Sequence, residues 1–101
     1  MSRRRNYSGN TIAIMERFFE ALDMCLEQKL IKTINGFCSD YGIDKRHLYA
    51  QRKDLGKGFF EVSWLLPLIT DCGISSTWLL TGKGLMFDTS AINITLKTPK
   101  E

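Results

Sequence analysis

Residues 42–44 carry the signals for the end of one helix and the start of the next. Gly42 can adopt the left-handed backbone with which a helix commonly ends. Asp44 can accept a hydrogen bond from a free amide at the start of the next helix. Ile43 lies between them and can fill the inside of the turn with an apolar side chain. The chain is therefore predicted to form two short helices, over about 33–41 and 45–54, joined by a sharp reversal.

The apolar residues of these two helices predict how they pack. Thr33 is a suitable N-cap for the first helix, and Leu48 is the central inward residue of the second. The small side chain of Cys38 permits close approach of the two helices. The inward side of the first helix is expected to carry Ile34, Phe37, Cys38 and Tyr41.

Three further helices are predicted from spacing and capping signals. Apolar residues recur at intervals of three and four over residues 11–28, and Asn10 or Thr11 can cap that helix. Ser63 is the expected cap of a helix over residues 64–71, in which Pro67 falls in the first turn. The last helix follows Ser75 or Ser76 and ends at Gly82, with Trp78, Leu79 and Leu80 inside it.

The fold class predicted for the chain is all-α, with five helices in one domain. Residues 1–10 are basic and polar and predict a flexible arm, and residues 11–87 form the domain. Residues 88–101 form a tail in which Ile92, Ile94 and Leu96 alternate with polar residues, a pattern typical of a β-strand. A homodimer is left open, with its interface on this tail or on the last helix.

Several classes of function are disfavoured by what the sequence lacks. The three cysteines are widely spaced and the chain has a single histidine, so neither a zinc site nor a Cys–His catalytic pair is indicated. We expect buried thiols in a cytoplasmic protein that is not an enzyme and has no cofactor and no small-molecule substrate. No segment is long enough to span a membrane, and no secretory signal is visible.

Charge is distributed unevenly along the chain. Residues 11–28 carry one cation against four acidic side chains, whereas residues 29–57 carry seven Lys and Arg against three Asp. A molecule with one basic side is suited to a polyanionic partner. Most of these cations fall on or beside the helix over residues 45–54, where Arg and Lys can reach guanine edges in a major groove. The candidate DNA-binding residues are Lys45, Arg46, Tyr49, Arg52, Lys53, Lys32, Lys57, Arg3, Arg4 and Arg5, with Lys29 also approaching the backbone.

Two stretches resemble the lambda-repressor/Cro-type (xenobiotic-response-element-like) helix-turn-helix family. The first is residues 37–43 (FCSDYGI), and the second is residues 73–84 (GISSTWLLTGKG), which is similar to the WLLTG-x-G ending of short bacterial members. The resemblance covers about residues 12–87. It implies a five-helix fold, sequence-specific binding of double-stranded DNA, usually as a dimer, and regulation of transcription, here of a phage or mobile element. It places the recognition helix at about residues 44–54.

The chain departs from the family pattern at two positions. Ile34 stands where members often carry a phosphate-binding glutamine, and Gln51 stands where many carry an apolar residue. Gln51 is expected to loosen the anchoring of the recognition helix in the core. These departures favour an alternative, a protein-interaction adaptor or anti-repressor that keeps the fold without binding DNA. Binding of structured RNA is a third interpretation.

Overall fold

The computed structural model describes residues 7–56 and 58–88, and over these residues the chain is all-α with no β-strand. The predicted strand in the tail and most of the predicted arm lie outside the described residues. No helix within the two described ranges is long and apolar enough to cross a membrane. In chain order the elements are α1 (Gly9–Glu27), α2 (Ile34–Tyr41), α3 (Lys45–Lys53), the 3-10 helix η1 (Val62–Trp64), α4 (Leu65–Thr70) and α5 (Ser76–Thr81).

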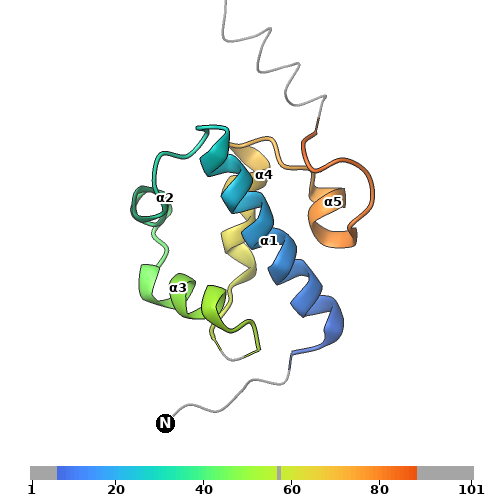
Figure 1. The fold of residues 1–101 in the computed structure, drawn as a ribbon, viewed down its shortest axis with the longest axis horizontal. Coiled ribbons are helices and arrows are strands. Elements are labelled where there is room, and N and C mark those ends of the chain that lie inside the picture. Colours follow the sequence, from blue (N-terminus) through green and yellow to red (C-terminus); the bar gives the residue numbers. More distant parts are fainter. Residues whose placement is uncertain (1–6, 57, 89–101) are drawn as a thin grey trace, which may run out of the picture.

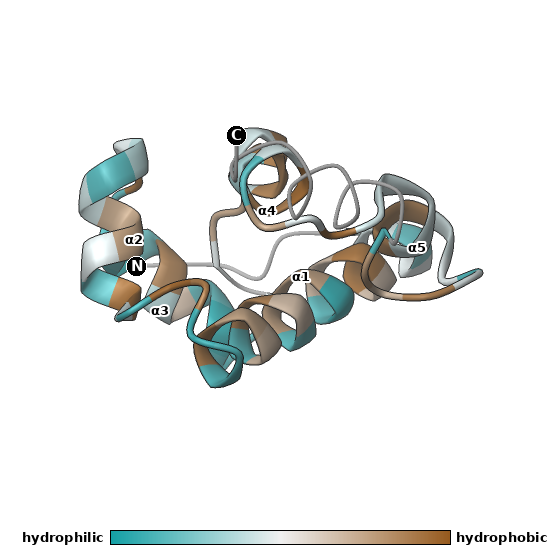
Figure 2. Ribbon diagram, turned by 90° about the horizontal axis from the view of Figure 1, so that it is seen from above, coloured by the Kyte–Doolittle hydropathy of each residue, from teal (hydrophilic) through white to brown (hydrophobic). Residues whose placement is uncertain are grey.

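Helix α1 is the longest element and the one around which the others are arranged. It crosses the molecule, with α2 and α3 on one side of it and α5 on the other, and α4 also packs against it (Figures 1 and 2). It begins earlier than the sequence predicted, because Ser8 is the N-cap and its Oγ accepts a hydrogen bond from the Thr11 amide. Its predicted apolar side is buried through Met15, Phe18 and Leu22, each fully inaccessible to solvent.

A continuous hydrophobic core joins α1 to every other helix. The ring of Phe18 packs edge-on against Phe60 at 5.7 Å between ring centroids, and Phe60 packs against Trp64 at 5.2 Å. Trp64 and Trp78 are both buried, as the sequence predicted, and so are all three cysteines. Burial of this many aromatic side chains is the main favourable contribution to folding.

Helices α2 and α3 and the turn between them match the sequence prediction closely. The Thr33 hydroxyl accepts a hydrogen bond from the Gly36 amide at 2.9 Å and caps α2. Gly42 has a φ of 67°, in the left-handed region, and the Asp44 carboxylate accepts from the Arg46 amide at 2.9 Å to cap α3. Tyr41 was predicted to point inward, but it is 41% exposed. Its ring lies beside Phe37, and its hydroxyl leaves the core to bind a carboxylate.

Gln51 was expected from the sequence to loosen the anchoring of α3, and the structure shows how it is accommodated. Its side chain is completely buried, and its Nε2 donates to the Leu55 carbonyl at 2.7 Å and lies 3.1 Å from the Met15 sulfur. A Cβ at Gly58 would lie 2.7 Å from the Gln51 Cα, so the chain passes directly over this point of α3. The amide therefore holds the loop after α3 against the helix, and the core anchoring is polar instead of apolar.

The start of the fourth helix differs from the prediction. Ser63 does not cap it, because Ser63 lies inside η1 and its hydroxyl donates to the Glu61 carboxylate at 3.2 Å. The chain turns through η1 directly into α4, which has no side-chain cap. Pro67 is buried in the first turn of α4, where a missing N–H costs little.

Helix α5 is fixed to α1 by an arginine. Arg17 donates from Nε to the Leu79 carbonyl at 2.8 Å and from Nη2 to the Leu80 carbonyl at 3.0 Å. These carbonyls lie in the last turn of α5, where unpaired acceptors and the helix dipole favour a cation. Ser75 caps the start of α5 and Gly82 ends it with a φ of 81°, both as predicted.

We predict that Gly58→Ala destabilises the protein by about 1–3 kcal/mol, because the new methyl group would overlap the backbone of α3 at Gln51. The free energy of unfolding in urea measures this effect. Gly9→Ala is the matched control, since a Cβ there meets nothing within 4 Å and alanine is favoured in a helix. Equal stability of the two variants would show that the chain does not pass this close to α3.

Candidate nucleic-acid interface

One side of α3 presents polar and cationic side chains to solvent. Lys45, Arg46, Tyr49 and Lys53 are all exposed, and we call these four residues the α3 stripe. Successive residues of a helix are about 100° apart, so the four fall within roughly 100° of one another. Gln51, the buried anchor, projects from the opposite side. The stripe is therefore turned outward by the same packing that buries Gln51.

A polar residue of α2 extends the stripe. The Tyr49 hydroxyl donates to Oδ1 of Asn35 at 3.2 Å, which joins the middle of α3 to the first turn of α2. That bond uses the amide oxygen of Asn35 and leaves its NH₂ group as a donor, and the residue is exposed. Asn35 was not predicted as a site residue, because the comparison with the family pattern depended on the preceding residue, Ile34. The signal available in the sequence was a polar residue in the first turn of the predicted helix, after the N-cap Thr33 and before the inward Phe37.

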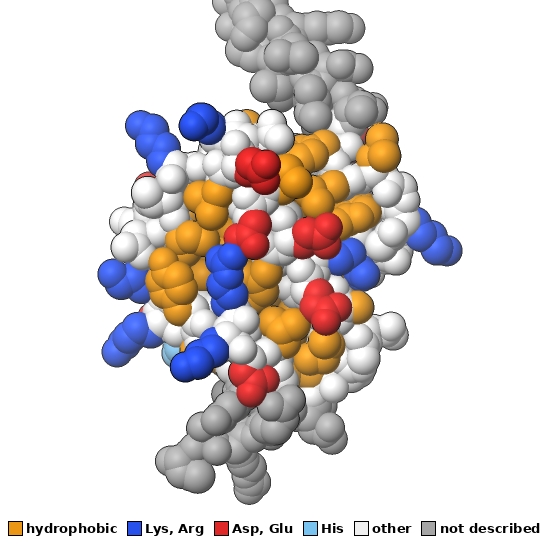
Figure 3. All heavy atoms as spheres, viewed as in Figure 1, with side chains coloured by type: hydrophobic (Ala, Val, Ile, Leu, Met, Phe, Trp, Pro, Cys, Tyr) orange, Lys and Arg blue, Asp and Glu red, His pale blue; other side chains and the backbone are white. Residues whose placement is uncertain are grey.

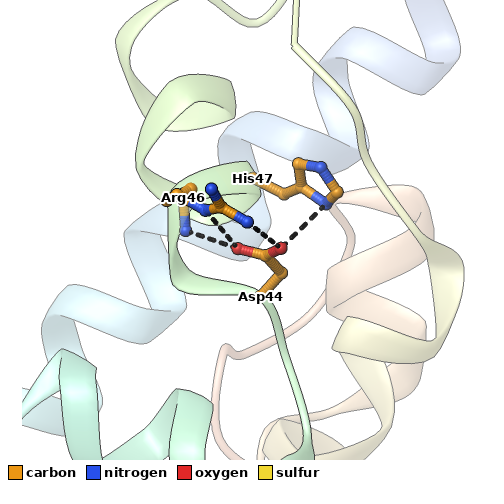
Figure 4. Close-up of polar contacts among 3 residues, drawn as sticks. All are labelled: Asp44, Arg46 and His47. Carbon is orange, nitrogen blue, oxygen red and sulfur yellow. Dashed lines mark hydrogen bonds and ion pairs between the residues drawn. The ribbon is translucent and has the colours of Figure 1, made fainter.

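Asp44 organises the start of α3. Besides capping the helix, its carboxylate accepts from the Arg46 guanidinium at 3.4–3.5 Å and lies 4.0 Å from Nδ1 of His47 (Figure 4). The side-chain hydrogen bond from Arg46 holds the pKa of Asp44 below its ordinary value. The Arg46 side chain is still 86% exposed, so this pairing restrains the guanidinium without covering it.

Arg52 is the predicted contact that the structure places apart from the stripe. It forms an ion pair with Asp23 of α1, and its guanidinium lies 5.7 Å from the centre of the Phe19 ring. Its side chain is one-third exposed. Arg52 therefore ties α3 to α1, and the α3 stripe carries its charge through Lys45, Arg46 and Lys53.

The remaining predicted cations lie around this surface or outside the described residues. Lys29 and Lys32 are exposed in the connection between α1 and α2, close to the start of α2. Lys57 and Arg3–Arg5 lie outside the described residues. Figure 3 shows Lys and Arg side chains gathered on the side of the molecule formed by α2 and α3, while Asp and Glu follow α1. Basic and acidic side chains, which are unevenly distributed along the sequence, are thus also unevenly distributed on the surface.

Neither a reactive Cys38 thiol nor a metal cluster is indicated among the described residues. Burial raises the pKa of the Cys38 thiol, which disfavours the reactive thiolate. No cluster of His, Cys, Asp and Glu within residues 7–56 and 58–88 has the arrangement of a metal site. At the end of α2, the Tyr41 hydroxyl donates to the Asp71 carboxylate at 2.6 Å and joins α2 to the end of α4.

No protein-family model matches this chain, and neither does any curated protein or any solved structure.

We predict a late ionisation step for one tyrosine. The hydrogen bond to Asp71 raises the pKa of Tyr41 to about 12, so the phenol stays neutral well above its ordinary pKa of about 10. The stabilisation from this contact is complete below the ordinary pKa and is lost as the pH rises through the raised one. Tyrosinate absorbance against pH measures the step.

Asp71→Asn should move this step down toward the ordinary value, because the negative charge that opposes ionisation is removed. Tyr41→Phe should abolish it and serves to assign it. If the wild type and Tyr41→Phe gave the same absorbance change above the ordinary tyrosine pKa, Tyr41 would have no raised pKa. That result would contradict the contact with Asp71.

Proposed function

We propose that the protein binds double-stranded DNA through the α3 stripe and regulates transcription as a member of the lambda-repressor-like class. The single observation that carries this proposal is the exposure of Lys45, Arg46, Tyr49 and Lys53 on one side of a short helix whose other side is buried. A helix of this kind can enter a major groove, where cations bind phosphates on either side and reach base edges between them.

The arrangement around α3 supports the same interpretation. The start of α2 brings Asn35 to the edge of the stripe, and Lys32 is exposed two residues before α2 begins. An amide donor therefore lies beside the entering helix, with an ammonium donor close to it in sequence. Phosphate contacts commonly come from helix N-termini and from such donors. Asn35 takes the place of the phosphate-binding residue that Ile34 removed from the family pattern.

The order of elements is also that of the resemblance found in the sequence. Five helices follow one another, a glycine-ended turn joins α2 to α3, and the WLLTG segment forms α5 against α1. On this basis we infer a lambda-repressor-like domain with α3 as the recognition helix. A role in transcription, for a phage or mobile element, follows from that resemblance.

An adaptor without DNA binding is less well supported once the structure is considered. That alternative depended on Ile34 and Gln51. Ile34 packs against the core, and Gln51 anchors α3 instead of loosening it. Neither residue obstructs the α3 stripe, so neither argues against the proposed contact with DNA.

We predict that the protein binds a duplex of random sequence at low salt and that Lys45→Ala weakens this binding. Loss of one phosphate contact should lower the slope of log K against log salt by about 0.9. Arg46→Ala, at a position suited to a base edge, should cost about tenfold or more on a site first selected from a pool of random duplexes. Fluorescence anisotropy of a labelled duplex over a series of salt concentrations measures both effects.

Lys83→Ala is the matched control, because it also removes one exposed lysine but lies after α5, at the other end of the molecule. It should leave the slope unchanged. Equal effects of Lys45→Ala and Lys83→Ala would sink the proposal, and so would a wild-type protein that does not bind duplex DNA. Stronger competition by duplex RNA than by DNA would favour the RNA interpretation. It would also contradict insertion of α3 into a groove, since the A-form major groove is too narrow for a helix.

A further inference from the structure

An open groove of about 540 Å³ lies behind the turn between α2 and α3. One wall is the turn itself, from Tyr41 to Asp44, and the other is formed by Phe59, Glu61 and the first turn of α4. His47 also lines the groove, and it follows Lys45 by about 200° round the helix. The groove is therefore on the side of α3 that faces away from the α3 stripe.

The lining of this groove has the chemistry of a site for cations. The rings of Tyr41 and Phe59 contribute partly exposed surface to the walls, and aromatic faces attract guanidinium and ammonium groups. The Phe59 ring also contacts the His47 ring, at 4.9 Å between centroids. Trp64 lines the groove as well, but it is 3% exposed and its ring packs in the core. The carboxylates of Asp44 and Glu61 lie among the lining residues, and no Lys or Arg does among the described residues that form the groove. A guanidinium can both stack on such rings and pair with a carboxylate.

The root of the arginine-rich arm is fixed next to the groove. The Tyr7 hydroxyl donates to the Gly58 carbonyl at 3.1 Å, across 51 residues of sequence. Gly58 directly precedes Phe59, which lines the groove. Six residues precede Tyr7, and they include Arg3, Arg4 and Arg5. A chain of six residues can extend about 20 Å from its root, and a long arginine side chain adds to that reach.

We propose that this groove is the docking site of the chain's own arm, residues 1–6, with arginine side chains over its aromatic walls and against Asp44 and Glu61. Three observations select this occupant: its three positive charges, its length, and the anchoring of Tyr7 beside the entrance. The proposal does not depend on binding of DNA. It concerns the free protein, and it holds the arm on the opposite side of α3 from the stripe.

Docking of the arm would also act on the start of α3. Asp44 restrains Arg46 by a hydrogen bond, and an arginine of the arm at the same carboxylate would compete for it. Arg46 would then be released towards the solvent side of the helix. An arginine of the arm would thus replace Arg46 as the partner of Asp44, the residue that caps α3.

The rate of trypsin cleavage after Arg3, Arg4 and Arg5, followed by mass spectrometry of the full chain, tests the proposal. A docked arm resists the protease, so Glu61→Gln and Asp44→Asn should each speed cleavage at these positions by about two- to fivefold. Both substitutions keep a side-chain oxygen, and asparagine is a good N-cap, so the local structure is retained. Glu20→Gln removes an exposed carboxylate from α1 and is the matched control.

Cleavage at wild-type rates in both groove variants would overturn the proposal. Faster cleavage in Glu20→Gln than in Glu61→Gln would also overturn it, because the arm would then be held by the acidic face of α1. A second measurement needs no change in the groove. The variant Arg3→Ala/Arg4→Ala/Arg5→Ala should shift the amide resonances of Glu61, Ser63 and Thr70, and shifts confined to the neighbours of Tyr7 would contradict docking.

Discussion

Only two side chains of α3 are buried, and the orientation of this helix about its own axis depends on them. Leu48 packs in the core, and Gln51 binds the loop that returns over the helix. A helix with so few apolar residues has little hydrophobic free energy to fix its rotation. Rotation by one residue position, about 100°, would turn part of the α3 stripe towards α1. The exposure of the stripe is thus a consequence of one buried amide and of a glycine that lets the loop approach it.

Buried polar groups are well suited to this task, because they stabilise one arrangement and penalise others. The Gln51 amide loses hydrogen bonds if the loop moves away, and an unpaired buried amide is costly. Its Oε1 has no hydrogen-bond partner within the described part of the chain, so the arrangement already carries some of this cost. The orientation of α3, the helix proposed to bind DNA, is therefore fixed by the hydrogen bond of a buried amide more than by a large apolar contact.

Local signals in the sequence were sufficient to predict most helix boundaries. Thr33, Asp44 and Ser75 act on amides two or three residues away, and Gly42 and Gly82 act through their own backbone. Such signals are complete within one turn of helix, so no tertiary information is needed to recognise them. The exposure of Lys45 and Arg46 also followed from local spacing.

Two of the differences from the sequence prediction concern side chains whose partners are distant in sequence. Arg52 pairs with a residue 29 positions away, and the Tyr41 hydroxyl with one 30 positions away. The polarity of Gln51 was considered without the Leu55 carbonyl that it binds, four residues further along the chain. Ser63 was assigned as a cap because the 3-10 turn that displaces it has no marked sequence signal. A family pattern records which residue type is usual at a position, and it does not record how a different residue is accommodated there.

The most direct test of the account is a map of amide chemical-shift changes when duplex DNA is added to the protein. We expect the largest changes to cluster at residues 45–53 and at the start of α2, around Asn35, with α5 little affected. Changes centred on α5 or on the acidic side of α1, with α3 unmoved, would contradict the claim that the outward side of α3 is the nucleic-acid surface.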